Sequence, residues 1–402
     1  MPIYLRAAMW AGALILAAGN ASAAPITLAE ALTRGANASP RLAEARARAE
    51  AAEARARQAG LGPNPEIGLV VENFGGTGPY RAFRSTETTL EVSQRLELGG
   101  KRSARLAVAG AERDFAAISF LRAQADLARD IREAHAGLRA AADRAVLAED
   151  NVTRATELVR TTGLLVENGR DPPLRKLRAD AILAEARAEA SRTYASYRAA
   201  QRALMSLTGI ADDEIAAAVS AEENAPPILP GTRSVEERLA EAERNAALAR
   251  INLARSDAVP DPTLGGGVRR FGEGGETAIV ASISIPLPVR NRNQNGIAAA
   301  RSDSVAAEAN LVQVRLDAER ARRDAATAFT AAEERVEAMS GPGSAQAEEA
   351  VRIARIGYQA GKFSLVELID AQTALNVAKL ALIDARLDRA RALAALIRAN
   401  AQ

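Results

Sequence analysis

Few residues of this chain have types that could do chemistry. Its 402 residues contain no cysteine, one histidine and four methionines. These counts argue against disulfides, thiolate metal sites and clusters of soft-metal ligands. The one histidine, His135, lies in a long run of helix-forming residues, and a lone histidine is far more often structural than a metal ligand. We therefore expect no cofactor and no bound metal.

No arrangement typical of an enzyme is visible either. The sequence offers no evident nucleophile beside a base and no phosphate-binding loop. The run Gly265-Gly266-Gly267 does not match a dinucleotide fingerprint, because no helix opens from it. Lys+Arg number 52 and Asp+Glu number 50, and no basic run lacks interleaved acids, so nucleic acid is not an expected partner.

Two carboxylates have a spacing that could act electrostatically. Glu367 and Asp370 are spaced i, i+3, which places both on one face of a predicted helix. Two carboxylates on one face concentrate negative charge, which attracts cations and repels anions. The alternative is that they are two solvated acids on an exposed helix face.

The element that dominates the sequence is a long predicted helix over 101–165. It contains no proline, and at ~1.5 Å per residue it would run ~95 Å. It carries a seven-residue repeat typical of a left-handed coiled coil with closely packed helices. The first series is Ile131, Leu138, Ala145, Val152 and Val159, and the alanines that follow its first four members by three residues are Ala134, Ala141, Ala148 and Ala155.

Composition favours narrow helical seams over a thick core. The chain is 48% hydrophobic but only 3% aromatic, and much of the apolar share is alanine. Alanine buries little area per residue, so a large globular core is not expected.

The N-terminus resembles a secretory signal peptide over 1–23. Arg6 precedes an apolar run, and Ala21-Ser22-Ala23 fits a cleavage site. A retained N-terminal anchor is the alternative. Elsewhere, no run of ~20 apolar residues suggests a membrane-spanning helix.

The remainder reads as two similar halves. The first, 24–208, contains a helix, a β-hairpin at about 66–96, the long helix and a return helix over 174–207. A linker or equatorial element over 209–232 follows. The second half, 233–402, contains a helix, a β-hairpin at about 263–287, a long helix over about 297–358 with a kink expected at Gly341-Pro342-Gly343, and a return helix over 364–399. Gly361 follows Gly169 by 192 residues, which indicates a duplicated unit.

The predicted strands have the length and alternation of membrane-spanning β-strands. Each is about 9–11 residues long, with one apolar and one polar face. A soluble sheet is the alternative. Four strands cannot close a barrel, and open sheet edges are not tolerated in lipid. Membrane-spanning strands would therefore require several copies. Two copies would supply eight strands, whose side chains fill the interior, and three would supply twelve, which can leave a lumen.

Three motifs resemble the TolC family of outer-membrane efflux proteins, and within it the heavy-metal (CzcC-like) branch. They are GPNPE at 62–66 with ENFGG at 72–76, QRLELGGKR at 94–102, and GYQAGKFSLVELIDAQ at 357–372. The resemblance covers nearly the whole mature chain. One departure is the missing cysteine, to which some relatives attach a lipid.

The resemblance implies a mainly α fold with a small β part. A long periplasmic helical barrel would join a twelve-stranded β-barrel shared by a homotrimer in the outer-membrane lipid of a Gram-negative bacterium. It also implies two partners, a periplasmic adaptor (membrane fusion) protein and an inner-membrane pump of the resistance–nodulation–division type.

The resemblance also assigns residues. Glu367 and Asp370 would ring the closed pore, and the tips that meet the adaptor are Gly169, Arg170, Asp171, Gly361, Lys362, Phe363 and Ser364. For Phe363, packing within its hairpin is the alternative. The 192-residue offset places Arg175 and Arg178 at the positions of Glu367 and Asp370. We therefore predict that these arginines pair with the two acids on adjacent hairpins.

The predicted function is the outer-membrane channel of a tripartite efflux system that exports heavy-metal cations. The alternatives are a channel for drug efflux or type I secretion, and a periplasmic coiled-coil adaptor.

Overall fold

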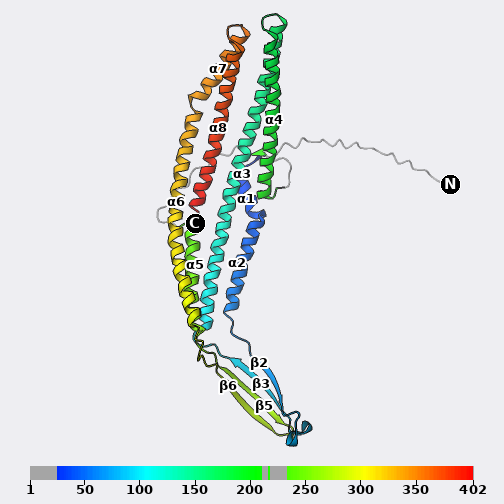
Figure 1. Cartoon of the computed structure of the whole chain (residues 1–402), viewed down its shortest axis with the longest axis vertical. Helices are drawn as coiled ribbons and strands as arrows, with labels where there is room; N and C mark the ends of the chain where they lie inside the picture. Colours follow the sequence, from blue (N-terminus) through cyan, green and yellow to red (C-terminus); the bar gives the residue numbers. More distant parts are fainter. Residues whose placement is uncertain (1–24, 211–215, 218–232, 402) are drawn as a thin grey trace, which may run out of the picture.

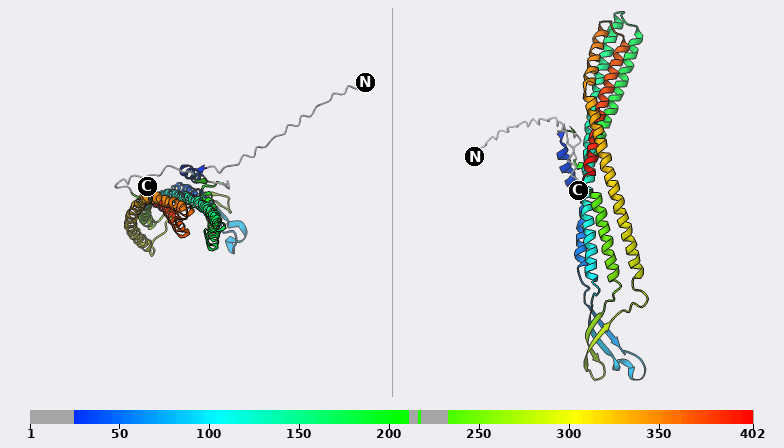
Figure 2. Two further views of the ribbon diagram at one scale, coloured as in Figure 1. Left: turned by 90° about the horizontal axis from the view of Figure 1, so that it is seen from above. Right: turned by 90° about the vertical axis from the view of Figure 1, so that its left-hand side faces the viewer.

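The computed structural model describes residues 25–210, 216–217 and 233–401. The predicted signal peptide and most of the predicted linker lie outside these residues. The described chain is elongated, with long helices side by side and a small sheet at one end (Figure 1). Viewed along the long axis, the helices form an open arc (Figure 2). Within the described residues, none of the helices combines the length and apolar character needed to cross a membrane.

The order of elements is similar in the two halves. The helices are α1 (Leu28–Ala38), α2 (Pro40–Ala59), α3 (Lys101–Glu167), α4 (Pro173–Thr208), α5 (Val235–Ser256), α6 (Gln294–Ser340), α7 (Pro342–Gln359) and α8 (Leu365–Ala399). The strands are β1 (Pro25–Ile26), β2 (Glu66–Glu72), β3 (Glu87–Arg95), β4 (Ala216–Ala217), β5 (Thr263–Phe271) and β6 (Thr277–Ser284), and two short 3₁₀ turns lie between β2 and β3.

Helix α3 is the axis of the molecule. Its 67 residues extend about 100 Å and pack against α2, α4, α5 and α8. Of the predicted seam, Ile131, Leu138, Ala141, Ala148 and Ala155 are buried. The other seam positions are only half-buried.

The long helix expected over 297–358 is two helices. It breaks at Gly341, where a kink in one helix was expected. Pro342 disfavours the helical conformation in the residue before it, and Gly341 accordingly has a ψ of −162°. Pro342 then occupies the first position of α7, where its missing N–H needs no helical partner.

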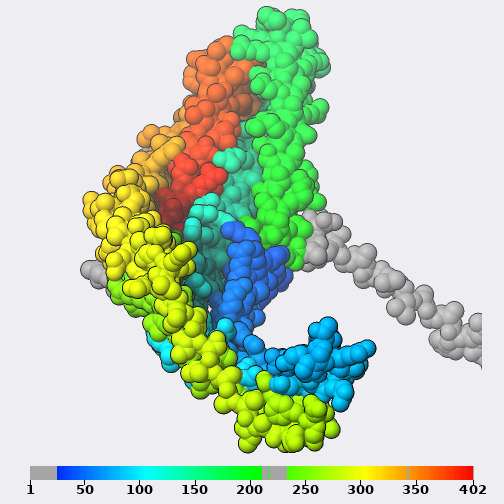
Figure 3. All heavy atoms as spheres, turned by 60° about the horizontal axis from the view of Figure 1, so that its bottom comes forward, coloured from blue at the N-terminus to red at the C-terminus, as the bar shows by residue number. Residues whose placement is uncertain are grey.

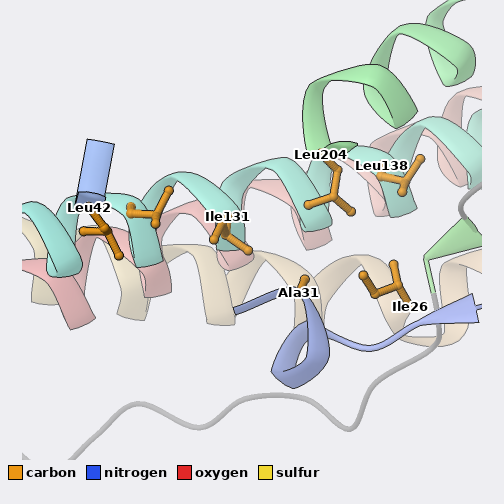
Figure 4. Packing of buried hydrophobic residues seen from close by; sticks show 7 residues of the cluster. Ile26, Ala31, Leu42, Ile131, Leu138 and Leu204 are labelled. Atoms are coloured by element: carbon orange, nitrogen blue, oxygen red, sulfur yellow. The ribbon is translucent and has the colours of Figure 1, made fainter. Parts of the chain in front are cut away.

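The largest group of buried apolar residues lies midway along the molecule. It joins β1, α1, α2, α3 and α4 through Ile26, Ala31, Leu42, Leu127, Ile131, Leu138 and Leu204 (Figure 4). The layer is thin, and Gly35 permits the close approach, because a Cβ there would collide with Ile131. Narrow contacts of this kind agree with the alanine-rich composition.

The sheet combines the strands of both halves. Its order is β2-β3-β5-β6, and every neighbouring pair is antiparallel. The central pair, β3 and β5, joins the two hairpins. Strand β6 ends at Ser284, three residues before the expected end, because Pro286 has no N–H to donate to a ladder.

The two faces of the sheet differ in a way that a soluble sheet would not. Large apolar side chains on one face are exposed, and Ile279 reaches 91%. On the polar face Thr89 is only 3% exposed. The exposed apolar face includes Ile67, Leu69, Leu90, Val92, Val268, Ile279 and Ile283. The sheet lies beyond the ends of the helices, and none of the described helices covers it (Figure 3).

A polar junction connects the sheet to the helices. Lys101, at the start of α3, forms a 2.7 Å ion pair with Asp261, which also accepts a hydrogen bond from the N–H of Leu98. Burial alone would raise the pKa of Asp261, but these hydrogen bonds outweigh it and lower the pKa. Gly99 has a φ of 69° and leaves room for Val259. The Gly-Gly-Lys motif at 99–101 therefore connects the first half of the chain to the segment that precedes β5 in the second half.

Candidate functional site

The two helical hairpins end in turns of the same design. The α3–α4 turn contains Gly169 and the α7–α8 turn contains Gly361, with left-handed φ values of 67° and 71°. In each turn, the N–H groups of the glycine and of the next residue donate to carbonyls three and five residues earlier, at 2.8–3.0 Å. This pattern is a Schellman motif, which favours glycine because a Cβ is strained at positive φ.

The two turns lie side by side at the end of the molecule farthest from the sheet (Figure 1). A Cβ on Gly361 would lie 3.4 Å from Nη2 of Arg170 in the other turn. The ring of Phe363 packs over Gly357, where a Cβ would collide with it, yet Phe363 remains 40% exposed. Phe363 therefore packs within its hairpin and still presents part of its ring to solvent.

A buried polar group links the first turn to the second hairpin. The hydroxyl of Tyr358 on α7 donates to Oδ2 of Asp171 at 2.8 Å, and Asp171 is also ion-paired with Arg175. Thr162 of α3 lies 3.3 Å from the same hydroxyl. Tyr358 is 2% exposed and the Asp171 side chain 6%. We call these four residues, Thr162, Asp171, Arg175 and Tyr358, the tip clasp.

The surroundings of the tip clasp make it sensitive to loss of any member. Burial raises the pKa of Tyr358, and its hydrogen bond to Asp171 acts in the same direction. Below the clasp, apolar side chains from α3, α4, α7 and α8 pack together, namely Leu158, Ala179, Ala354, Leu365 and Leu368. Since both hairpins contribute to this layer, a rearrangement of one tip must disturb the other.

The two acids of the second tip are placed differently. Glu367 forms a capping box with Ser364: its carboxylate accepts from the Ser364 N–H at 2.6 Å, and its own N–H donates to the Ser364 hydroxyl at 3.3 Å. The backbone hydrogen bond from Ser364 lowers the pKa of Glu367. Asp370 lies one turn further along α8, and both acids are exposed. Their charges are therefore available at the surface of the tip.

The predicted pairing of the arginines with these acids is not made within the chain. Arg175 pairs with Asp171, four residues earlier, because the buried carboxylate of Asp171 requires a cation. Arg178 is exposed. In the part of the chain that the structure describes, neither arginine forms an ion pair with Glu367 or Asp370.

Sequence reasoning missed the role of Tyr358 and Thr162. Tyr358 lies inside the motif over 357–372, from which the resemblance assigns no role to this tyrosine, and the resemblance places Asp171 only on the docking surface. The spacing of Asp171 and Arg175 at i, i+4 was a usable signal of an ion pair. The contact between Asp171 and Tyr358, 187 residues apart, had no local signal.

His135 has the structural role that we expected. It is buried on α3, and its Nε2 lies 3.1 Å from the carbonyl oxygen of Ile26. Burial lowers its pKa. Among the described residues, no cluster of three or more histidine or acidic side chains could hold a metal ion.

Comparison with known proteins agrees with this architecture. Residues 32–210 and 238–402 match the model of the outer membrane efflux protein family. The nickel-cobalt-cadmium resistance protein NccC of Alcaligenes xylosoxydans xylosoxydans is 34% identical over 273 residues, 67% of this chain but only 62% of that relative. The cobalt-zinc-cadmium resistance protein CzcC of Cupriavidus metallidurans is 28% identical over 370 residues, 89% of this chain and 86% of that relative.

The fold is also that of a solved channel. The crystal structure of the Campylobacter jejuni CmeC outer membrane channel superposes with a TM-score of 0.80 at 15% identity, covering all of this chain and 94% of that one. The family match confirms the relationship and the outer-membrane location that the motifs indicated. The chain belongs to the outer membrane efflux protein family.

Proposed function

We propose that this chain is the outer-membrane channel of a tripartite efflux system and that it exports heavy-metal cations. The observation that carries the proposal is the sheet, whose apolar face is exposed, whereas most polar-face residues of the central strands β3 and β5 are half-buried. This arrangement suits a strand wall with lipid outside and water inside. A periplasmic spacer, the alternative reading, would have no reason to expose such a face.

The sheet also needs further copies of the chain. Strands β2 and β6 are its edges, and edges facing lipid would leave backbone N–H and C=O groups unpaired. Three copies would pair these edges and close a twelve-stranded barrel, wide enough to leave a lumen. The open arc of helices seen along the axis would close in the same way (Figure 2).

The helical end is the proposed gate and docking surface. The tip clasp holds the two hairpins of each chain together. Glu367 and Asp370 of three chains would place six carboxylates at the opening, a ring that attracts cations and repels anions. The exposed ring of Phe363 and the adjacent cations Arg170 and Lys362 would meet a periplasmic adaptor, which connects the channel to an inner-membrane pump.

Heavy-metal cations are the proposed substrate because both reported relatives are named for resistance to them, NccC to nickel, cobalt and cadmium and CzcC to cobalt, zinc and cadmium. The acidic tip is compatible with this cargo, since divalent cations gain twice the electrostatic energy of monovalent ones at such a ring.

Planar-bilayer recordings of the purified protein test the proposal. We expect a cation-selective pore that also carries Co²⁺, Zn²⁺ and Cd²⁺, with selectivity that falls in Glu367→Gln/Asp370→Asn. A matched control, Glu50→Gln/Glu53→Gln on α2, removes two acids of the same spacing away from the tips. No pore from well-folded protein would overturn the channel. A pore whose selectivity ignores the tip variant would overturn the gate assignment.

A further inference from the structure

The charges on the polar face of the sheet are distributed unevenly. Near the turns, two acids share one guanidinium: Arg269 forms ion pairs with Glu72 at 3.1 Å and Glu87 at 2.8 Å. Its Nε also donates to Thr89 at 2.9 Å. Strands β2, β3 and β5 are thereby connected, and each of the two acids here has a cationic partner.

Further along the same face, one carboxylate has no such partner. Glu91 of β3 lies between Gly68 of β2 and Gly267 of β5 in the ladder. Within the described residues, no cation lies at ion-pair distance from it. Its neighbours across the strands have no side chain, so the side chain of Glu91 can lie across the surface of the sheet.

The carboxylate of Glu91 is nevertheless held in place. The hydroxyl of Ser282 on β6 donates to Oε1 of Glu91, which reaches across β5 to meet it. The carboxylate passes over Gly265, where a Cβ would collide with both Glu91 and Ser282. The glycines at 265 and 267, which are not a nucleotide-binding loop, thus leave room for the Glu91 side chain to lie on the surface of the sheet.

We infer that Glu91, held by Ser282 over Gly265, is a second cation-selecting element of the channel, inside the barrel. The inference rests on the proposed function, because only a closed barrel turns the polar face into a lumen. Three chains would supply one uncompensated carboxylate each at one level of the wall. A cation leaving the helical tips would then meet a second acidic ring before it reaches the exterior.

The size of the effect follows from the geometry of a closed barrel. Twelve strands spaced ~4.8 Å apart and tilted ~40° give a backbone radius of ~12 Å. A carboxylate lying flat on the wall is then ~9 Å from the axis. Three such charges should change the ratio of cations to anions on the axis about sixfold at 0.1 M salt, but only about 1.3-fold at 1 M, where screening is stronger.

The test exploits the absence of cysteine, since Glu91→Cys carries a unique thiol. The variant is made in the background Asp171→Asn/Tyr358→Phe, which removes the tip clasp and so widens the tips. A methanethiosulfonate reagent bearing a sulfonate restores the negative charge at position 91, and one bearing a quaternary ammonium reverses it. The readout is the reversal potential in a KCl gradient.

We expect the K⁺/Cl⁻ permeability ratio to be several-fold higher after the anionic reagent than after the cationic one at 0.1 M, and nearly equal at 1 M. Glu273→Cys, in the turn between β5 and β6, is the control and should respond much less. Equal ratios with both reagents in a conducting pore would overturn the inference and leave the channel intact. Absence of any pore in the wild type would instead overturn the proposed function.

Discussion

Removal of one hydroxyl group at the helical tips should loosen the gate. Tyr358→Phe keeps the buried ring and deletes the 2.8 Å hydrogen bond to Asp171. Hydrogen bonds to charged groups contribute about 1.5–3 kcal/mol, and since Asp171 retains Arg175 we expect about 1.5 kcal/mol per chain. Each 1.4 kcal/mol is a factor of ten, so the open population should rise about tenfold if chains open singly, and up to about a thousandfold if three open together.

Single-channel recording measures this directly as open probability. The control is Tyr194→Phe on α4, which deletes the hydroxyl of an exposed tyrosine away from the tips. Thermal unfolding should show that both variants remain folded. If Tyr358→Phe has the open probability and conductance of the wild type, the tip clasp does not hold the gate and the reasoning is refuted.

The same clasp should respond to alkaline pH. Burial raises the pKa of Tyr358 above its ordinary value of 10.0, so the folded tip favours the protonated hydroxyl. Its contribution to stability is fully present below pH 10 and is lost as pH rises through the folded pKa. Wild-type open probability should therefore increase above pH 10, whereas Tyr358→Phe, already without the hydroxyl, should show a weaker dependence.

Three other substitutions probe the rest of the described chain. Asp261→Asn should lower the free energy of unfolding in detergent by about 3 kcal/mol, because Lys101 loses its partner. Folding lowers the pKa of Asp261, so the free-energy difference between variant and wild type, measured from denaturation curves, should shrink as pH falls below 3.8. Gly357→Ala should displace the Phe363 ring and weaken binding of the periplasmic adaptor in pull-down assays, and unchanged binding would exclude Phe363 as an anchor. His135→Leu should lower the melting temperature by removing a buried hydrogen bond of about 1 kcal/mol, but a change in metal conductance would contradict its structural role.

Local sequence signals indicated the long helices and the two hairpin turns at the tips. Helix α3 contains no proline over its 67 residues, and the Gly341-Pro342 pair marks the break between α6 and α7. The turn glycines Gly169 and Gly361 mark both tips. Each of these features depends on residues close in sequence, where propensity, proline sterics and left-handed backbone decide the conformation.

Contacts between the halves were decided only by the tertiary structure. From the sequence, Arg175 could form an ion pair either with Asp171 or with the acids Glu367 and Asp370. In the structure it pairs with Asp171, because packing against Tyr358 buries that carboxylate and leaves the other two acids exposed. Alternation in the strands indicated two faces, but only the pairing of β3 with β5 placed Arg269 beside Glu87 and left Glu91 unpaired. Burial and long-range pairing depend on the whole chain. A carboxylate that the fold buries needs a cationic partner, whereas an exposed carboxylate is stabilised by water.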